Sequence, residues 1–234
     1  MLKEQVTKAD YSKNENDDDF CRLTLTVEVK ANQVLVLGIR AKWFLIDWEM
    51  TGWSESKRHK FKKAGFHNIN IIGGRILWLN VDGCGVTFIH FDRCDFLTRL
   101  RCQGNKLKEL NLKNCPALTF IDCSRNALEF VQVANLKRLK EFKGNENKLH
   151  VMDFSGCSEL QEVDLSYNEV VIIVTRKCRK LKCILFNGAF FEVKNYKKAA
   201  GDFPGVIINE KGFLNIIEDK RLSGITGRLN EYLT

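Results

Sequence analysis

Hydrophobic residues recur with a period of 21 from Ile76 onward. Five rows of 21 residues begin at Ile76, Leu97, Leu118, Leu139 and Leu160. Row positions 1, 4, 6, 11, 14 and 16 are apolar throughout, except at Gly144 and Thr175, and the rows align without gaps. A coil this short buries its apolar face only by stacking on neighbouring copies. The pattern therefore predicts a stack of equivalent coils.

The spacing within each row predicts strands on both sides of the coil. Apolar positions 4 and 6 alternate with mostly polar positions 3, 5 and 7, and positions 14 and 16 repeat this alternation. A period of two is typical of a strand with one buried face. An amphipathic helix needs apolar residues three and four apart over a longer stretch. We therefore expect a mainly β solenoid with a parallel sheet and largely extended return limbs.

Two further columns run through the rows. Position 9 holds an amide in four rows, at Asn105, Asn126, Asn147 and Asn168. An amide both donates and accepts hydrogen bonds, so this column is expected to satisfy backbone groups in the turn after each strand. Position 19 is mostly cysteine, and a stacked pair such as Cys94 and Cys115 would come within disulfide range. The apolar slot already accounts for these residues, and we expect free thiols.

The third row resembles the leucine-rich repeat, L-x-x-L-x-[LC]-x-x-N-x-L, in the segment Leu118-Thr-Phe-Ile-Asp-Cys-Ser-Arg-Asn126-Ala-Leu128. The 21-residue period and the cysteine at position 6 are similar to the short-repeat subclass common in Bacteroidetes proteins. The resemblance covers residues 76 to about 191, with departures at Cys84 and Thr175. It implies a bacterial solenoid whose sheet presents a protein-recognition face. It also implies a secreted or cell-envelope protein.

The flanking segments predict end caps, because the open apolar edge of a terminal coil needs cover. Residues 1–19 form a polar tail that is expected to be disordered. Residues 20–75 predict a β-rich N-terminal cap domain, in which Leu23, Leu25, Val27 and Val29 alternate with polar residues. The solenoid is expected over 76–191, as five full repeats and a partial sixth. Residues 192–234 are expected to form a small C-terminal cap, with a strand near 206–209 and a short helix within 213–222.

Leucine-rich solenoids bind partners through sheet positions 3, 5 and 7, so the resemblance places an interface there. The expected partner-binding residues are Trp78, Asn80, Asp82, Arg99, Arg101, Gln103, Phe120, Asp122, Ser124, Glu141, Lys143, Asn145, Glu162 and Asp164. Exposed aromatics among charges are common interface anchors. Trp78 and Phe120 are therefore the expected anchors, with Arg99 and Arg101 beside them. The alternative is that a cap covers Trp78 and that Phe120 packs on its neighbours.

The net charge of +8 does not come from this face, where acidic residues outnumber basic ones. Nucleic acid is therefore not expected to bind there. Positive charge gathers on a turn after the return limb, at Arg176, Lys177, Arg179 and Lys180. This basic turn ridge is the alternative site, for an anionic polymer, a glycan or a membrane surface. Solvated turns explain it equally well, and the basic stretch 57–63 is interpreted as a solvated loop.

No catalytic or metal-binding motif accompanies the repeat. The sequence has no phosphate-binding loop, nucleophile elbow, H-E-x-x-H motif or C-x-x-C pair, so no enzyme activity, cofactor or metal site is expected. The longest apolar run, Val170 to Val174, is too short to span a bilayer. No secretory leader is evident at the first residues. We expect a non-catalytic protein-interaction module.

Overall fold

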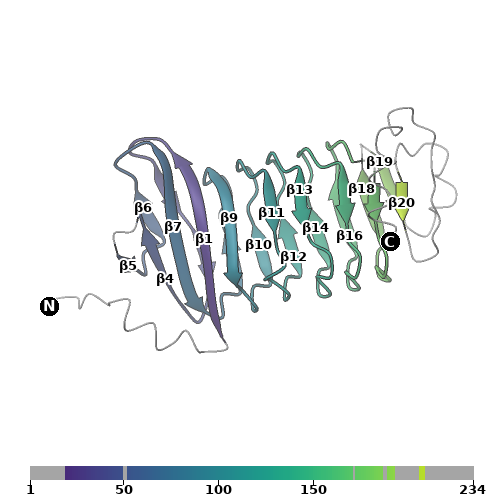
Figure 1. The fold of residues 1–234 in the computed structure, drawn as a ribbon, viewed down its shortest axis with the longest axis horizontal. Coiled ribbons are helices and arrows are strands. Elements are labelled where there is room, and N and C mark those ends of the chain that lie inside the picture. Colours follow the sequence, from purple (N-terminus) through teal and green to yellow (C-terminus); the bar gives the residue numbers. More distant parts are fainter. Residues whose placement is uncertain (1–18, 50–51, 171, 187–188, 193–205, 209–234) are drawn as a thin grey trace.

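The computed structural model describes residues 19–49, 52–170, 172–186, 189–192 and 206–208, most of them drawn in colour in Figure 1. All the secondary-structure elements assigned in these residues are β-strands. No helix in these residues is long and apolar enough to cross a membrane. The strands are β1 (Phe20–Val29), β2 (Val34–Val36), β3 (Gly38–Arg40), β4 (Trp43–Trp48), β5 (Trp53–Ser54), β6 (Arg58–Lys60), β7 (Gly65–Gly74), β8 (Trp78–Asn80), β9 (Val86–Arg93), β10 (Arg99–Arg101), β11 (Glu109–Asn111), β12 (Phe120–Asp122), β13 (Phe130–Gln132), β14 (Glu141–Lys143), β15 (Val151–Asp153), β16 (Glu162–Leu165), β17 (Ile172–Val174), β18 (Cys183–Phe186), β19 (Ala189–Glu192) and β20 (Val206–Ile208).

One layer of the molecule is an eight-stranded sheet in the order β19-β18-β16-β14-β12-β10-β8-β3. Six strands of this sheet run parallel, namely β8, β10, β12, β14, β16 and β18. Their paired residues are 21 positions apart in the sequence, as in Leu79↔Leu100 and Leu100↔Ile121. β3 and β19 join the two edges in antiparallel orientation. The register sets equivalent row positions side by side. The predicted mainly β, parallel-sheet solenoid is therefore confirmed.

The return limbs form the second layer and are extended, as the alternation at positions 14 and 16 predicts. β11 pairs with β13, and β15 pairs with β17, which β20 then extends. In the described residues no ladder joins β9 to β11 or β13 to β15. The coils are still bonded at the start of each limb, where Lys106 N donates to Val86 O (2.8 Å) and Lys148 N to Leu128 O (2.9 Å). The second layer therefore has two gaps in its strand pairing, one between β9 and β11 and one between β13 and β15.

The N-terminal residues contribute strands to both layers. A five-stranded antiparallel sheet, β5-β4-β7-β1-β9, includes the return limb of the first row, so it continues the second layer (Figure 1). β3 instead pairs with β8, the first strand of the solenoid. Because strands are exchanged in this way, one hydrophobic core runs from Cys21 to Ile184.

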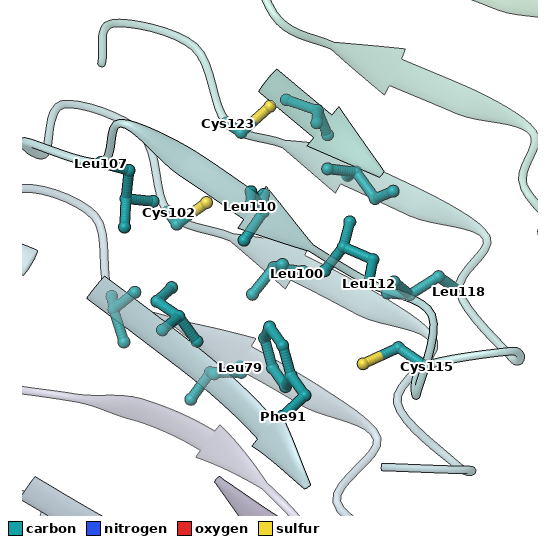
Figure 2. Packing of buried hydrophobic residues seen from close by; sticks show 14 of the residues in the cluster. Leu79, Phe91, Leu100, Cys102, Leu107, Leu110, Leu112, Cys115, Leu118 and Cys123 are labelled. Carbon is teal, nitrogen blue, oxygen red and sulfur yellow. The ribbon is translucent and has the colours of Figure 1, made fainter. Parts of the chain in front are cut away.

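The apolar framework of the rows lies between the two layers. Figure 2 shows Leu100 of the eight-stranded sheet close to Leu110 of a return limb, and Leu79 close to Phe91 of β9; all four are at most 3% exposed. The glycine at position 6 of the fourth row also has a packing reason. A Cβ at Gly144 would lie 2.6 Å from Cε1 of Phe142, so the phenylalanine ring occupies the space that a larger residue fills in other rows.

Cys21 and Cys94 form a disulfide, so the expectation of free thiols throughout is wrong for this pair. Cys21 lies on β1 and Cys94 in the turn after β9, with their Cα atoms 4.7 Å apart. The sequence argument considered only partners one coil apart, whereas Cys21 comes from outside the repeat. The seven other cysteines are free. The bond ties the N-terminal sheet to the first turn of the solenoid.

Several predicted elements lie outside the described residues. They are the polar tail up to residue 18, the helix within 213–222 and most of the C-terminal cap. Of the strand expected near 206–209, Val206–Ile208 forms β20 and lies parallel to β17.

Candidate functional site

Strands β10, β12, β14 and β16 each lead into a turn that contains an asparagine at position 9. Asn126 Oδ1 accepts a hydrogen bond from Leu107 N at 3.0 Å. Its Nδ2 donates to the carbonyl oxygens of Cys102, Cys123 and Ser124 at 2.9, 3.0 and 3.1 Å. Asn105, Asn147 and Asn168 make the same set of bonds in their own coils. Each amide joins two neighbouring coils and sets the geometry of the turn beside the outward face.

Aspartate side chains at position 5 bond the turn that follows the strand in two coils. Asp122 Oδ1 accepts from Ser124 Oγ (2.6 Å) and Ser124 N (3.2 Å), and Asp164 Oδ1 accepts from Ser166 N (2.9 Å). An aspartate that bonds the backbone two residues on stabilises a turn in place of a further ladder bond. Positions 3 and 5 lie in the sheet, and position 7 lies at its edge.

The 21-residue register arranges the predicted partner-binding residues in columns. Position 3 consists of Trp78, Arg99, Phe120, Glu141 and Glu162, and position 5 of Asn80, Arg101, Asp122, Lys143 and Asp164. The position 7 residues are Asp82, Gln103, Ser124 and Asn145, which follow the strand ends. The structure brings these residues onto one face, but it exposes them unequally.

Phe120 is covered, contrary to the expectation of an exposed anchor. The residue is 7% exposed. Arg99 Cζ lies 4.5 Å and Lys143 Nζ 5.7 Å from the centre of the ring. Both cations come from neighbouring strands, and a cation over an aromatic face is attracted to it. Phe120 therefore serves as a platform that holds Arg99 and Lys143, as the alternative reading of this residue proposed.

The charged side chains in the middle of the face bind one another. Arg101 Nε donates to Asp82 Oδ2 at 2.7 Å, and Asp82 Oδ1 accepts from Gln103 N at 2.8 Å. Arg101 Nη2 also lies 3.8 Å from Asp122 Oδ2. The hydrogen bond to Asp82 raises the pKa of Arg101. We call Arg99, Arg101, Phe120, Asp122 and Lys143 the central patch.

The two ends of the face differ in character. Trp78 is half-buried beside β3, where a Cβ at Gly38 would lie 3.0 Å from Cη2 of the indole. Glycine thus permits the close approach of Trp78 to the neighbouring strand. At the other end Glu162 is exposed, while Glu141 Oε1 pairs with Lys143 Nζ at 3.0 Å. The far end of the face is therefore acidic.

The basic turn ridge lies on the turn after β17. Lys177, Arg179 and Lys180 are exposed, and Arg176 is half-buried. Lys180 Nζ pairs with Glu159 Oε2 at 2.7 Å, one coil earlier. This carboxylate offsets part of the positive charge of the ridge.

Most free cysteines lie in the core and are poor nucleophiles. Burial raises the pKa of Cys84 to about 11 and that of Cys157 to about 12. Burial also raises the pKa values of Cys102, Cys115 and Cys123. Because the thiolate is the reactive form, these thiols stay inert near neutral pH.

A cluster in the N-terminal sheet escaped the sequence analysis. Glu49 Oε2 lies 2.7 Å from His59 Nε2, and Glu49 Oε1 lies 2.7 Å from His67 Nδ1. Trp48 stacks on His59 with ring centres 5.1 Å apart. The contacts hold the turn after β4 against β6 and β7, so part of the stretch 57–63 is packed. No group of three or more His, Cys, Asp or Glu among the described residues could hold a metal ion.

Three exposed phenylalanines on the second layer were also missed. Phe66, Phe88 and Phe130 are 68%, 42% and 50% exposed. A signal was available for two of them, because Phe88 and Phe130 both occupy row position 13, an outward position of the return limb. An aromatic residue at an outward strand position is a candidate contact residue.

No protein-family model matches the chain, and no curated protein matches it. The structure itself shows a β-solenoid of stacked coils with a 21-residue spacing.

Proposed function

We propose that this chain is a leucine-rich-repeat protein of the short 21-residue class and acts as a non-catalytic protein-interaction module. The proposed interface is the outward face of the eight-stranded sheet. The N-terminal sheet and the residues after β18 are proposed to cap the two ends of the stack. The asparagine at position 9, with one set of bonds in four coils, supports the family assignment.

The organisation of the central patch is the observation that carries this proposal. Arg101 is held by Asp82 at 2.7 Å, and Phe120 holds Arg99 at 4.5 Å. Because these side chains are already held in place, they lose less conformational entropy when a partner binds. Arginine is also among the residue types that contribute most to binding energy at protein interfaces. The patch therefore suits specific recognition.

Charge changes sign along the face and indicates what a partner would present. β10 carries Arg99 and Arg101, whereas β16 carries Glu162 and Asp164. Complementary charge increases the rate of association and fixes the register of a partner. The proposed partner has acidic groups opposite β10 and basic groups opposite β16.

The test uses one charge reversal on the face and a matched reversal on the ridge. Arg99→Glu changes an exposed residue of the central patch, and Arg179→Glu changes an exposed residue of the basic turn ridge. Each purified variant is immobilised and exposed to an extract of the source cells, then washed with rising salt. We expect a protein that wild type and Arg179→Glu retain through high salt and that Arg99→Glu loses.

The alternative is that the basic turn ridge binds an anionic polymer, a glycan or a membrane surface. Vesicles with and without anionic lipid, and an acidic polysaccharide, are tested on the same three proteins. Binding that Arg179→Glu removes, that Arg99→Glu retains and that modest salt releases would overturn the sheet proposal. Equal thermal melting of the variants shows that each reversal leaves the fold intact.

A further inference from the structure

Three exposed phenylalanines share the outward face of the second layer. Phe66 on β7 lies opposite Glu28 on β1, and Phe88 on β9 lies opposite Thr26. Residues two apart on a strand point to the same side, and directly opposed residues also share a side. Phe66 and Phe88 therefore project from the same surface. This surface faces away from the core and from the central patch.

Phe130 continues the same line beyond β9. It lies opposite Glu109 in the β11–β13 pair. Phe88, Glu109 and Phe130 all line one hollow, which places them on one surface. We call Phe66, Phe88 and Phe130 the aromatic row, because they cross the second layer in the order β7, β9, β13.

The spacing of the aromatic row is regular in strand intervals. β1 separates β7 from β9, and the coil of β11 separates β9 from that of β13. Hydrogen-bonded strands lie about 4.8 Å apart, so Phe88 and Phe130, which share row position 13 two coils apart, are at least about 10 Å apart across the unpaired gap between β9 and β11. An extended β-linked sugar chain covers a similar distance with two pyranose units. Phe88 and Phe130 are therefore spaced to contact every second sugar of such a chain, and Phe66 offers a further ring to one side of that line. Phe66 is offset from Phe88 by two residues along the strands, because it pairs with Glu28 whereas Phe88 pairs with Thr26.

Hollows occur where the second layer opens. The hollow between β9 and β11 has a volume of about 200 Å³, and its lining includes Phe88, His90, Glu109, Asn111 and Phe130. A second hollow of about 700 Å³ lies between β13 and β15, with Phe130, Gln132 and Asp153 in its lining. Phe130 thus separates two depressions that carry amide and carboxylate groups. Such groups donate to and accept from hydroxyls.

The surface around the row is polar, and the residues that line its two hollows carry no excess of positive charge. Thr26 Oγ donates to Asn68 Oδ1 at 3.0 Å, and Glu28 pairs with Lys106 at 2.6 Å. Glu109 and Lys113 line the first hollow together. These charges balance, whereas the second hollow beside Phe130 is lined by Glu129, Asp153 and Glu169 against Lys148 and His150. A strongly acidic polymer gains little from such a surface.

We propose that the aromatic row binds a neutral, extended polysaccharide that runs across the strands of the second layer. A pyranose ring has an apolar C–H face that packs on an aromatic ring, and hydroxyls around its rim that need hydrogen-bonding partners. Isolated phenylalanine rings with amides and carboxylates between them match both features. This binding site is separate from the protein interface proposed on the opposite face.

Affinity electrophoresis in native gels tests the proposal with three soluble neutral polysaccharides: hydroxyethylcellulose, xylan and galactomannan. Alginate serves as the acidic comparison. We expect at least one neutral polymer to slow the wild-type protein. Phe88→Ala and Phe130→Ala should each weaken that binding at least tenfold, and the double variant should migrate as it does without polymer. Both residues are exposed, and equal melting temperatures confirm that the variants fold.

Two controls separate this site from the others. Tyr167→Ala removes an exposed aromatic of a different turn (77% exposed), and Arg99→Glu alters the central patch. Neither should change the migration. Calorimetry with the hexasaccharide of the binding polymer should give an affinity at least tenfold higher than with its disaccharide, because only the longer chain reaches two rings.

Four outcomes would overturn the proposal. They are no retardation by any of the neutral polymers, retardation that survives the double variant, binding to alginate alone, and equal affinity for the two oligosaccharides. Capture of a protein that depends on Phe88 and Phe130, without any polysaccharide binding, would reassign the row to a protein partner. Failure of the Arg99→Glu experiment leaves these results unaffected, so the two proposals fail independently.

Discussion

At the scale of single residues, the asparagine at position 9 meets the hydrogen-bonding needs of a whole turn. Asn126 bonds three carbonyl oxygens and one backbone N–H, and two of these partners belong to the preceding coil. A buried backbone group without a partner costs free energy, so the amide is the side chain that suits this place. Every fully buried polar side-chain atom in the described residues has a hydrogen-bond partner.

Asn126→Leu tests this role. The substitution leaves an N–H and carbonyl groups of the turn unpaired, and we expect the free energy of unfolding to fall by about 1–3 kcal/mol. Urea denaturation measures the change. Asn145→Leu is the control, because the side chain of Asn145 bonds Glu146 on the exposed surface at 3.4 Å. Equal midpoints for the two variants would contradict the role assigned to Asn126.

The buried thiols predict a loss of stability at alkaline pH. Burial raises the pKa of Cys84 from 9.0 to about 11 in the folded protein. Between these values the unfolded chain releases the proton and the folded chain keeps it, so rising pH favours unfolding. The stabilisation is complete below about pH 8.5 and is lost through pH 11, at up to about 1.4 kcal/mol per pH unit for each such thiol.

Urea unfolding at pH 8 and pH 10 measures this effect. The free energy of unfolding should fall between the two values, and Cys84→Ala should reduce that fall by about 1 kcal/mol. An identical fall for wild type and Cys84→Ala would show that this thiol titrates alike in both states.

At the scale of elements, β9 belongs to two structures at once. It is the return limb of the first row, yet it extends over eight residues, whereas β11, β13, β15 and β17 each have three. The difference follows from its neighbour, because β1 provides an antiparallel partner along most of its length. The disulfide between Cys21 and Cys94 adds a covalent link at the same junction.

Loss of this disulfide should destabilise the protein markedly. The two cysteines are 73 residues apart, and closing a loop of that length restricts the unfolded chain by about 4 kcal/mol in the loop-entropy model. We expect the Cys21→Ala, Cys94→Ala double variant to lose a comparable free energy of unfolding. Hydrogen exchange should accelerate in β1 and β9 before it does in β14 and β16.

Reductant provides the control for the disulfide. It should lower the unfolding free energy of the wild-type protein and leave that of the double variant unchanged, because the remaining cysteines are free. A reductant effect of equal size on both proteins would assign the stabilisation to something other than this bond.

At the scale of the whole molecule, the stack behaves as a series of interchangeable coils. In the eight-stranded sheet, paired residues of neighbouring parallel strands are 21 positions apart all the way from β8 to β18. Stability in such a stack is close to a sum of terms for each coil and for each contact between neighbours. Removal of one complete coil should therefore shorten the molecule without destroying it.

Deletion of residues 118–138 removes one full row and joins Ala117 to Leu139 in register. We expect this protein to fold, with β-sheet circular dichroism and a lower free energy of unfolding, because one coil and one contact between coils are lost. Deletion of 119–138 removes 20 residues and shifts the following rows by one. Leu118 then remains as an extra residue in the turn before Leu139, so this coil no longer matches its neighbours and the control should be less stable than the in-register deletion. Similar behaviour of both deletions would contradict the coil account.

The repeat made the coils predictable, because contacts between them recur at one separation in the sequence. The core positions, the parallel register and the place of Asn126 all depend on that single period. The exposure of Phe120 does not, since it is decided by where the long side chains of Arg99 and Lys143 settle. The spacing of residue types along the chain does not predict side-chain conformation.

By itself, the sequence determined the stack of coils, their apolar interior and the polar turns, because the same pattern of apolar and polar residues recurs in every row. Only the tertiary structure decided how residues 20–75 attach to the first coil, through the Cys21–Cys94 bond and the shared strands. It also decided that Phe66 and Phe88 share a face. These contacts join segments of different separations that occur once, and a contact that occurs once has no period from which to infer it.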